Sequence, residues 1–331
     1  MHGCKFMKEQ TIHTESPYVN LRKVAIIGCG FVGAATGFSL LQSGLFSEMV
    51  LIDADKEKAE GEALDISHGE PFTKPMEIYA GDYNDIVDAS IIIITAGANQ
   101  KPGETRLDLV KKNIQIFKSI IPEITKRNCK GILLIVSNPV DILTYTALKL
   151  SGFAENRIIG SGTVLDTARL KEKLGSRLFV DSRSVHAYII GEHGDSEIAA
   201  LSSANVSGIS LHEFCEMREF QNPEETMKEI EDMVKNSAYE IIDKKQATYY
   251  GIAMSIRRIC EAIVRDEKSI LPISSMLHGE YGIHDVVLSI PAVIGKNGLE
   301  TKVPISLNNE EMSNLHKSAK ALQKVIMEND I

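Results

Sequence analysis

The chain has 331 residues, of which 44% are hydrophobic, so it is long enough for roughly two domains and is not disordered throughout. Its net charge of −9 disfavours a protein whose whole surface binds nucleic acid or an anionic membrane. The five cysteines are scattered and lack the close Cys/His pairs of zinc sites. We therefore expect no metal site, and free thiols in a reducing cytoplasm.

Residues 1–21 contain no apolar core followed by a small-residue cleavage site, so we expect a short N-terminal arm there. No later run approaches the roughly 18 apolar residues of a membrane span.

From Lys23 onward, short apolar runs alternate with longer amphipathic ones. The apolar runs predict strands at 23–28, 49–54, 77–81, 89–97 and 131–139, and the amphipathic ones predict helices at 31–43, 56–67 and 107–127. Repeated strand–helix–strand units predict a doubly wound parallel α/β sheet, because parallel strands need crossover connections. We assign residues 22–162 to this Rossmann domain.

The rhythm changes in the second half, which we assign to a mixed α+β substrate domain over residues 163–331. A helix is expected near 163–174, and strands around 184–191. One long helix should run from Pro223 to about Arg265, bent near Gly251. Strands at 269–277 and 284–295 and a helix at 309–328 should complete the domain.

The strongest short motif is "GCGFVG", which places Gly28, Gly30 and Gly33 between the first strand and the first helix. Glycines there allow a tight turn and a close approach of the backbone to a pyrophosphate at the helix N-terminus. Asp53 ends the next strand, where a carboxylate accepts hydrogen bonds from ribose hydroxyls and repels a 2′-phosphate. The pair favours NAD over NADP.

Two further segments carry groups suited to acid–base chemistry. "GEHGDSE" (191–197) places His193 between glycines in a polar segment, and "LDTARL" (165–170) places Asp166 and Arg169 on one face of a helix. Each alone would be explained as well by an incidental histidine or a surface ion pair. Together with a nucleotide fold, they match the equipment of a 2-hydroxy acid dehydrogenase.

Six ordered motifs make the resemblance specific: "GCGFVG", "AGANQKPGETRLDLV", "SNPVDILTY", "SGTVLDTARL", "VHAYIIGEHGDSE" and "KKQATYYGIA". The chain resembles the lactate and malate dehydrogenase family over residues 22–330, with more likeness to its bacterial L-lactate dehydrogenase branch. The resemblance implies reversible reduction of pyruvate to (S)-lactate with NADH in fermentative glycolysis, and a homotetramer.

The resemblance also implies residue roles. His193 is expected to exchange the proton with the substrate, Asp166 to orient it, Arg169 to bind the substrate carboxylate, and Arg106 to polarise the carbonyl. The implied substrate-binding set also includes Gln100, Asn138 and Thr248. The implied cofactor-binding set, beyond the glycines and Asp53, is Val32, Lys58, Tyr83, Gly97, Ala98, Asn113, Asn138, Ser161 and Ile252. A cis bond is implied between Asn138 and Pro139.

Gln100 separates the two activities of the family. At the matching position malate dehydrogenases carry an arginine, which would pair with the second carboxylate of oxaloacetate. A neutral amide leaves that carboxylate uncompensated in a closed site, so Gln100 favours pyruvate.

Other hypotheses remain at this point. Other 2-oxo acids are open as substrates, and a non-redox NAD-binding hydrolase or a non-catalytic protein is disfavoured by the intact set of His193, Asp166, Arg169 and Arg106. Lys171 and His186 match an allosteric site for fructose 1,6-bisphosphate in bacterial members. Lys171 stands where an arginine is expected, which keeps the charge but loses bidentate recognition of a phosphate.

Overall fold

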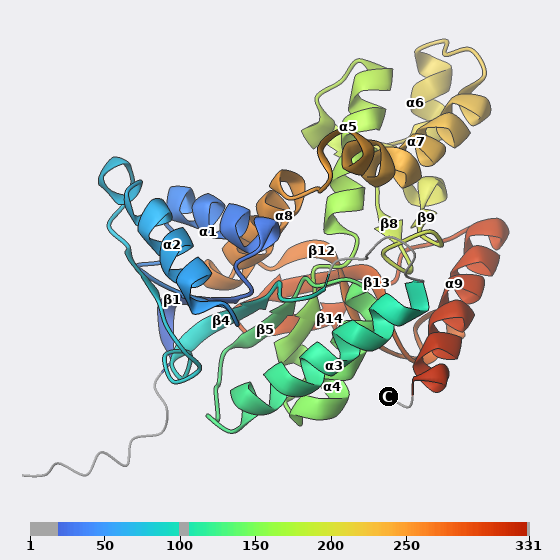
Figure 1. The fold of residues 1–331 in the computed structure, drawn as a ribbon. Coiled ribbons are helices and arrows are strands. Elements are labelled where there is room, and N and C mark those ends of the chain that lie inside the picture. Colours follow the sequence, from blue (N-terminus) through green and yellow to red (C-terminus); the bar gives the residue numbers. More distant parts are fainter. Residues whose placement is uncertain (1–18, 99–105, 330–331) are drawn as a thin grey trace, which may run out of the picture.

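The structure is a computed structural model that describes residues 19–98 and 106–329. Six parallel strands form the first half of its central sheet (Figure 1): β1 (Asn20–Ile27), β2 (Glu48–Ile52), β3 (Glu77–Ala80), β4 (Ala89–Ile94), β5 (Ile132–Ile135) and β6 (Ile158–Gly160). They lie in the order β3-β2-β1-β4-β5-β6, so the direction of strand addition reverses between β1 and β4. This is the order of a doubly wound dinucleotide-binding sheet, in which ligands bind beyond the carboxyl ends of the strands.

Helices cover both faces of these strands, as their continuous apolar sequences require. One face packs against α1 (Phe31–Ser43), α2 (Lys56–Ser67) and α8 (Tyr250–Val264). The other packs against α3 (Arg106–Thr125) and α4 (Val140–Ser151), and α9 (Asn309–Glu328) joins the same apolar cluster where it packs against β13 (His284–Gly295). All six residues of β4 are buried between these layers.

Local sequence sets the helix ends. The Asp55 side chain accepts the backbone N–H of Lys58 at the start of α2, and Gly44 ends α1 with a φ of +61°. At α9, Asn308 and Glu311 form a reciprocal capping box.

The second half extends the same sheet. The antiparallel strands β12 (Ser269–His278), β13 (His284–Gly295) and β14 (Gly298–Lys302) follow β6 in the sheet order. The joint is narrow, because β12 pairs with β6 at Ser274 and Gly160 alone. The sequence predicts a mixed second half, but it does not predict that these strands continue the first sheet.

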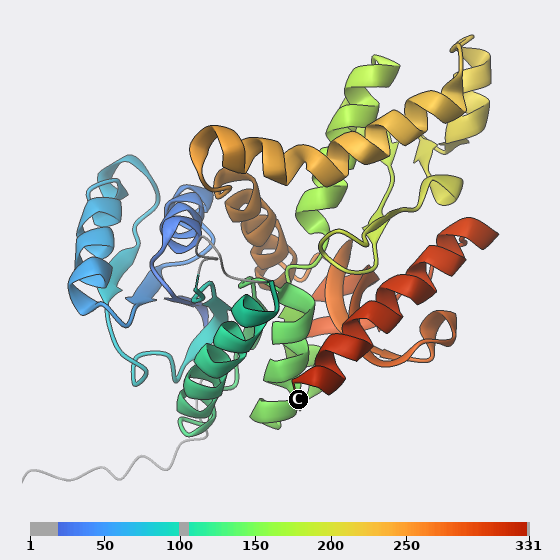
Figure 2. The same ribbon diagram turned by 45° about the vertical axis from the view of Figure 1, so that its right-hand side comes forward.

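The remaining elements stand to one side of the sheet (Figure 2). They are α5 (Val164–Leu178), α6 (Leu211–Met217), α7 (Pro223–Lys245) and the two-residue strands β7 (Val185–His186), β8 (Ile189–Ile190), β9 (Ile198–Ala199), β10 (Asn205–Val206) and β11 (Ile209–Ser210). A separate apolar cluster holds them together, with Leu170 and Leu174 from α5 and Ile230 and Val234 from α7.

The helical stretch predicted from Pro223 to about Arg265 is helical over most of its length, but it consists of two separate helices and not of one bent near Gly251. Helix α7 ends at Lys245, because Gln246 takes a left-handed conformation with φ of +70°, and α8 begins at Tyr250. The break therefore precedes Gly251, which lies in the first turn of α8.

The structure also describes most of the cysteines and the apolar character of the helices. The four cysteines in the described part of the chain (Cys29, Cys129, Cys215 and Cys260) are buried and free. Among the helices described, none combines the length and the apolar character needed to cross a membrane.

Candidate active site

The glycine turn lies between β1 and α1, at the point where the strand order reverses. Gly28 has a φ of +104°, and a Cβ there would lie 2.4 Å from the backbone nitrogen of Ala96. A Cβ on Gly33 would lie 1.9 Å from the Gly28 carbonyl oxygen. A Cβ on Gly30 would meet nothing within 4 Å, so space is open at the N-terminus of α1. Backbone N–H groups beside open space suit a pyrophosphate.

Asp53 follows β2 and its carboxylate lies against this turn. Its Oδ2 accepts the backbone N–H of Cys29 at 2.6 Å, and its Oδ1 accepts that of Asp55 at 3.0 Å. These two bonds fix the carboxylate while leaving lone pairs on both oxygens for ribose hydroxyls. The carboxylate is thus oriented by the fold before any ligand binds.

A second cluster of predicted residues follows β4 and β5 at the same edge of the sheet. Asn113 of α3 is 2% exposed; its Oδ1 accepts the backbone N–H of Ala98 at 2.7 Å, and its Nδ2 donates to the Asn138 carbonyl at 2.7 Å. The Asn138–Pro139 bond is cis. Ser161, which follows β6, is buried. Asn113 therefore ties two of the loops that border the expected cofactor site.

The other predicted cofactor-side residues are less closely grouped. Val32 of α1 and Ile252 of α8 are half-buried. Lys58 of α2 and Gly97, which follows β4, are exposed. Tyr83 packs against the core on the α3 side, with the Arg127 guanidinium 5.5 Å from its ring centroid.

His193, Asp166 and Arg169 converge at the start of α5. His193 Nδ1 lies 2.6 Å from Asp166 Oδ2, and Arg169 Nη1 donates to Asp166 Oδ1 at 2.7 Å. Asp166 is 2% exposed, whereas the His193 side chain is 25% exposed. One carboxylate therefore holds both cations, and the second ring nitrogen of His193, Nε2, is left for a substrate.

Contacts with distant segments hold the histidine segment in place. Gly191 exchanges two backbone hydrogen bonds of 2.9 Å with Ser289 of β13. Thr163 Oγ1 donates to the Ile189 carbonyl at 2.6 Å, and Thr167 Oγ1 accepts the Ile189 N–H at 2.9 Å. Because Thr163 and Thr167 flank Asp166, the same bonds place His193 and Asp166 in register.

Electrostatics favour the charged forms of this pair. Burial alone would lower the pKa of His193, but the adjacent Asp166 carboxylate outweighs it and raises that pKa to about 9. Burial alone would raise the pKa of Asp166, but His193 and Arg169 hold it below its ordinary value. The imidazolium–carboxylate form is therefore the resting state at neutral pH.

Sequence reasoning missed two buried acids beside His193. Asp141 of α4 accepts the backbone N–H of His193 at 2.8 Å and the hydroxyl of Ser274 at 2.5 Å. Burial raises the pKa of Asp141 to about 6. Glu197 is the last residue of "GEHGDSE" and is 5% exposed. The sequence gives one indication of their importance: Asp141 lies in the motif "SNPVDILTY" and Glu197 in "GEHGDSE", which were identified through other residues.

Two important predictions fall outside the described structure. Gln100 lies in the segment between residues 98 and 106, and Arg106 begins α3 with a side chain that is not described. Thr248 lies half-buried between α7 and α8. The roles of Gln100 and Arg106 therefore remain sequence predictions.

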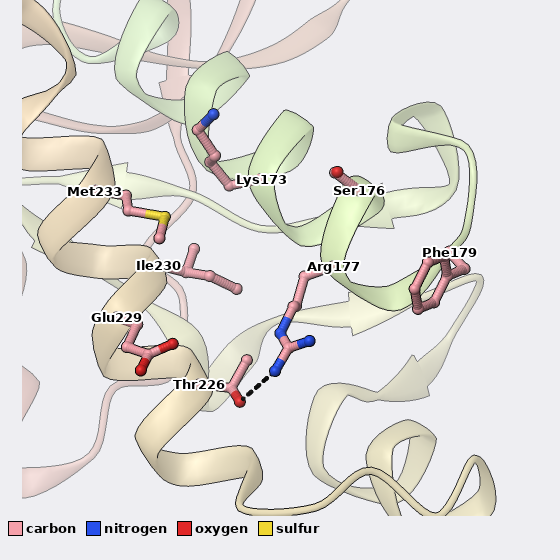
Figure 3. Close-up of a pocket in the computed structure, with 8 residues that line it drawn as sticks. All are labelled: Lys173, Ser176, Arg177, Phe179, Thr226, Glu229, Ile230 and Met233. Carbon is pink, nitrogen blue, oxygen red and sulfur yellow. Dashed lines mark hydrogen bonds between the residues drawn. The ribbon is translucent and has the colours of Figure 1, made fainter. Parts of the chain in front are cut away.

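The predicted effector residues lie on neighbouring segments. Lys171 is half-buried on α5, and burial lowers its pKa; His186 is exposed on β7. A pocket of about 440 Å³ lies nearby between α5 and α7 (Figure 3), where Arg177 Nη2 donates to Thr226 Oγ1 at 3.3 Å. Neither Lys171 nor His186 lines it. His193 does not line this pocket either. We place the active site at His193, because the hydrogen bonds that join His193 and Arg169 to Asp166 lie there.

A dinucleotide-binding sheet edge, with a histidine held by an aspartate beside an arginine, defines a dehydrogenase. Family models agree: the lactate/malate dehydrogenase NAD binding domain matches residues 22–160, and the α/β C-terminal domain of the same family matches residues 163–330. The chain belongs to the lactate/malate dehydrogenase family.

Individual relatives cover nearly the whole chain. An L-lactate dehydrogenase of Acetivibrio thermocellus is 54% identical over 94% of this chain and 98% of its own length. L-lactate dehydrogenase 1 of Clostridium acetobutylicum is 53% identical over 91% of this chain and 96% of its own length. The ligand-bound crystal structure of the minor L-lactate dehydrogenase from Enterococcus mundtii has a TM-score of 0.90 at 44% identity, covering 93% of this chain and 98% of that one.

Proposed function

We propose that this chain is an L-lactate dehydrogenase, which reduces pyruvate to (S)-lactate with NADH and runs the reverse reaction. The observation that carries the proposal is the Asp166 carboxylate bridging His193 and Arg169, just beyond the carboxyl edge of a dinucleotide-binding sheet. The relatives from Acetivibrio thermocellus and Clostridium acetobutylicum carry this name at 54% and 53% identity.

His193 supplies the proton in this mechanism. With Nδ1 held by Asp166, a protonated His193 donates from Nε2 to the C2 oxygen of pyruvate. In lactate oxidation the neutral ring takes the proton back. The neighbouring carboxylate fixes the ring tautomer and stabilises the cation, so the exchange needs little rearrangement.

Arg169 binds the substrate carboxylate. One guanidinium nitrogen is bonded to Asp166 at 2.7 Å, which fixes the plane of the group. The other N–H groups are then oriented to form two parallel bonds with a carboxylate. Arg106 is proposed to polarise the carbonyl that receives the hydride.

NAD is the proposed cofactor: its reduced form would supply the hydride for pyruvate reduction, and its oxidised form would accept the hydride in lactate oxidation. The open space at Gly30 and the oriented Asp53 carboxylate fit a pyrophosphate and a ribose without a 2′-phosphate. Further cofactor contacts are proposed for Val32, Lys58, Tyr83, Gly97, Ala98, Asn113, Asn138, Ser161 and Ile252, on the basis of family resemblance.

The family resemblance also supports three finer proposals. The protein would act as a homotetramer in the cytoplasm, and fructose 1,6-bisphosphate would bind at Lys171 and His186. Sedimentation gives the assembly state. Pyruvate saturation curves with and without the bisphosphate test activation, and superimposable curves would end that part of the proposal.

The decisive experiment compares kcat/KM for pyruvate, oxaloacetate and 2-oxoisocaproate, each with NADH and with NADPH. We expect pyruvate with NADH to be strongly preferred. The Gln100→Arg variant should raise the ratio of kcat/KM for oxaloacetate to kcat/KM for pyruvate by at least about a hundredfold (~3 kcal/mol). A preference for oxaloacetate in the unmodified protein would instead identify a malate dehydrogenase.

A further inference from the structure

Glu197 is a buried acid that the mechanism above does not use. It is 5% exposed, and its Oε1 has no hydrogen-bond partner among the described residues. Ligand-type atoms of Glu197, Asp166 and His193 all lie within 4.8 Å of one another. A third titratable group therefore lies in direct reach of the proton-transfer pair.

The surroundings of Glu197 do not compensate a second negative charge. From α5, Asp166 faces it with a carboxylate and Arg169 with a guanidinium already bonded to Asp166 at 2.7 Å. From α7, Lys235 faces it, but Lys235 Nζ bonds Glu231 at 3.0 Å. The remaining charged group is His193 itself, which is bonded to Asp166.

Two buried carboxyl groups this close do not both ionise readily, because each raises the cost of charging the other. Asp166 receives hydrogen bonds from both His193 and Arg169, so Asp166 keeps its charge. Glu197 has a bare Oε1, and a bare buried carboxylate oxygen costs far more than a neutral acid. The proton belongs on Glu197.

We propose that Glu197 is a positioning residue: it stays protonated while His193 exchanges its proton, and so keeps the charge of the substrate pocket balanced. This inference rests on the proposed reduction of a 2-oxo acid. With neutral Glu197, His193, Arg169 and the proposed Arg106 carry three positive charges and Asp166 and Asp141 carry two negative ones, and the single carboxylate of pyruvate cancels the remaining +1. An ionised Glu197 would leave the bound complex with an uncompensated negative charge.

The pKa of Glu197 agrees with this geometry. Burial, and after it the Asp166 charge, raise that pKa to about 8. The form that binds pyruvate thus holds two protons, one on His193 and one on Glu197. Both are lost in alkaline solution, and because the two groups interact, the steps belong to the pair.

The first test is the pH profile of the pyruvate KM. In the unmodified protein, the slope of log KM against pH should approach two in alkaline solution, because two protons are lost. In Glu197→Gln, whose amide imitates the neutral acid, the slope should approach one, and KM at pH 7 should stay within about twofold. If Glu197 is instead ionised at pH 7, the same variant would remove a negative charge that opposes the substrate carboxylate, so KM at pH 7 would fall by about tenfold or more and both profiles would have a slope near one in alkaline solution. That result would overturn the proposal.

The second test needs no activity. Infrared spectra of the unmodified protein at pH 7 should contain a protonated-carboxyl C=O band that disappears as the pH rises through about 8. The band should be absent in Glu197→Gln and present in Glu311→Gln. Glu311 is a matched control because it is also buried, but its carboxylate accepts hydrogen bonds from Ser202 and Asn308.

The two readouts separate the possible failures. If pyruvate is not a substrate but the band titrates, the proposed function fails and the protonated Glu197 stands. If no such band exists in the unmodified protein, the inference about Glu197 is wrong whatever the substrate. The titration of the unmodified protein decides this even if Glu197→Gln does not fold.

Discussion

Asp166 is the residue on which the site depends most. It is almost fully buried, and its two oxygens are divided between an imidazole and a guanidinium. Removing its charge would leave His193 without the interaction that raises its pKa and Arg169 without the bond that orients it. A loss at Asp166 therefore affects proton transfer and substrate binding together.

Replacing Asp166→Asn should lower kcat/KM for pyruvate at pH 7 by at least about a hundredfold, because the amide keeps the shape but not the charge. Steady-state kinetics measure the loss, and thermal unfolding reports whether the fold survives. Asp181→Asn is the control, since Asp181 forms an exposed pair with Arg183 outside the site. A variant at Asp166 with near-normal kcat/KM at pH 7 would contradict the assigned role.

The raised pKa of His193 gives the two directions of the reaction opposite pH dependences. Pyruvate reduction needs the imidazolium and the proton of Glu197, so its kcat/KM should fall as the pH rises through about 8 to 9. Lactate oxidation needs the neutral imidazole, so its kcat should rise as His193 loses its proton. The stabilisation of the fold by this ion pair has the same sign: it is fully present below the ordinary histidine value and is lost through about pH 9. Initial rates in both directions between pH 6 and 10 check this.

Sequence reasoning found part of this site and missed part for a physical reason. His193, Asp166 and Arg169 were predicted because each lies in a short motif, and Asp166 and Arg169 are one helical turn apart. Asp141 contacts His193 across 52 positions of sequence, and no local pattern encodes such a contact. The burial of Glu197 likewise depends on how α5 and α7 pack.

At the scale of elements, the turn between β1 and α1 distinguishes packing from binding. Gly33 is required by the protein itself, because a Cβ there would overlap the Gly28 carbonyl oxygen. Gly30 faces open space and is required by nothing in the described structure. The absence of a side chain at Gly30 therefore serves the binding of a ligand and not the packing of the protein.

Gly30→Ala and Gly33→Ala should therefore differ. Gly30→Ala should leave the melting temperature nearly unchanged and weaken NADH binding by at least about tenfold (~1.4 kcal/mol), because the methyl group occupies the approach of the pyrophosphate. Gly33→Ala should lower both stability and affinity, since its Cβ would lie 1.9 Å from a carbonyl oxygen. Fluorescence titration with NADH and thermal unfolding measure the two effects. Equal loss of stability in both variants would show that the turn is purely structural.

The bounds of three helices with a capping residue at one end were predicted well, whereas α4 and α6, which carry Gly152 and Ser210 as caps, were not predicted. Helices α1, α2 and α9 match the expected 31–43, 56–67 and 309–328, and each has a glycine, aspartate or asparagine at one end. The α7–α8 break was missed because Gln246, a residue with no turn preference, adopts the left-handed conformation there.

At the scale of the whole molecule, the two halves of the sheet meet at a small polar joint. Ser274 of β12 pairs with Gly160 of β6, and its hydroxyl donates to Asp141, which in turn accepts the N–H of His193. One serine therefore connects the sheet joint to the active site. The sequence predicted β12 but neither β6 nor the joint itself, which forms between residues far apart in the chain.

Ser274→Ala should destabilise the protein by about 1–3 kcal/mol, because it leaves the buried Asp141 oxygen without its donor. The neighbouring Ser275 provides a matched control, since it is also buried but its Oγ has no partner among the described residues. Ser275→Ala should be neutral or slightly stabilising. Urea unfolding measures the free energy of unfolding of both variants. Equal values would show that the hydrogen bond from Ser274 to Asp141 does not stabilise the protein.

The way His193 is held also has a consequence for how the protein acquires activity. Its ring and its backbone N–H are fixed by α5 and α4, and Gly191 beside it is fixed by β13, at separations of 27 and 52 residues for the first two contacts. Contacts of such long range form late, since the chain must close large loops before they are made. Catalytic competence is thus a property of the completed molecule, and an incompletely folded chain would be inactive rather than partly active. The activity recovered during refolding should therefore measure only the fraction of chains that have folded completely.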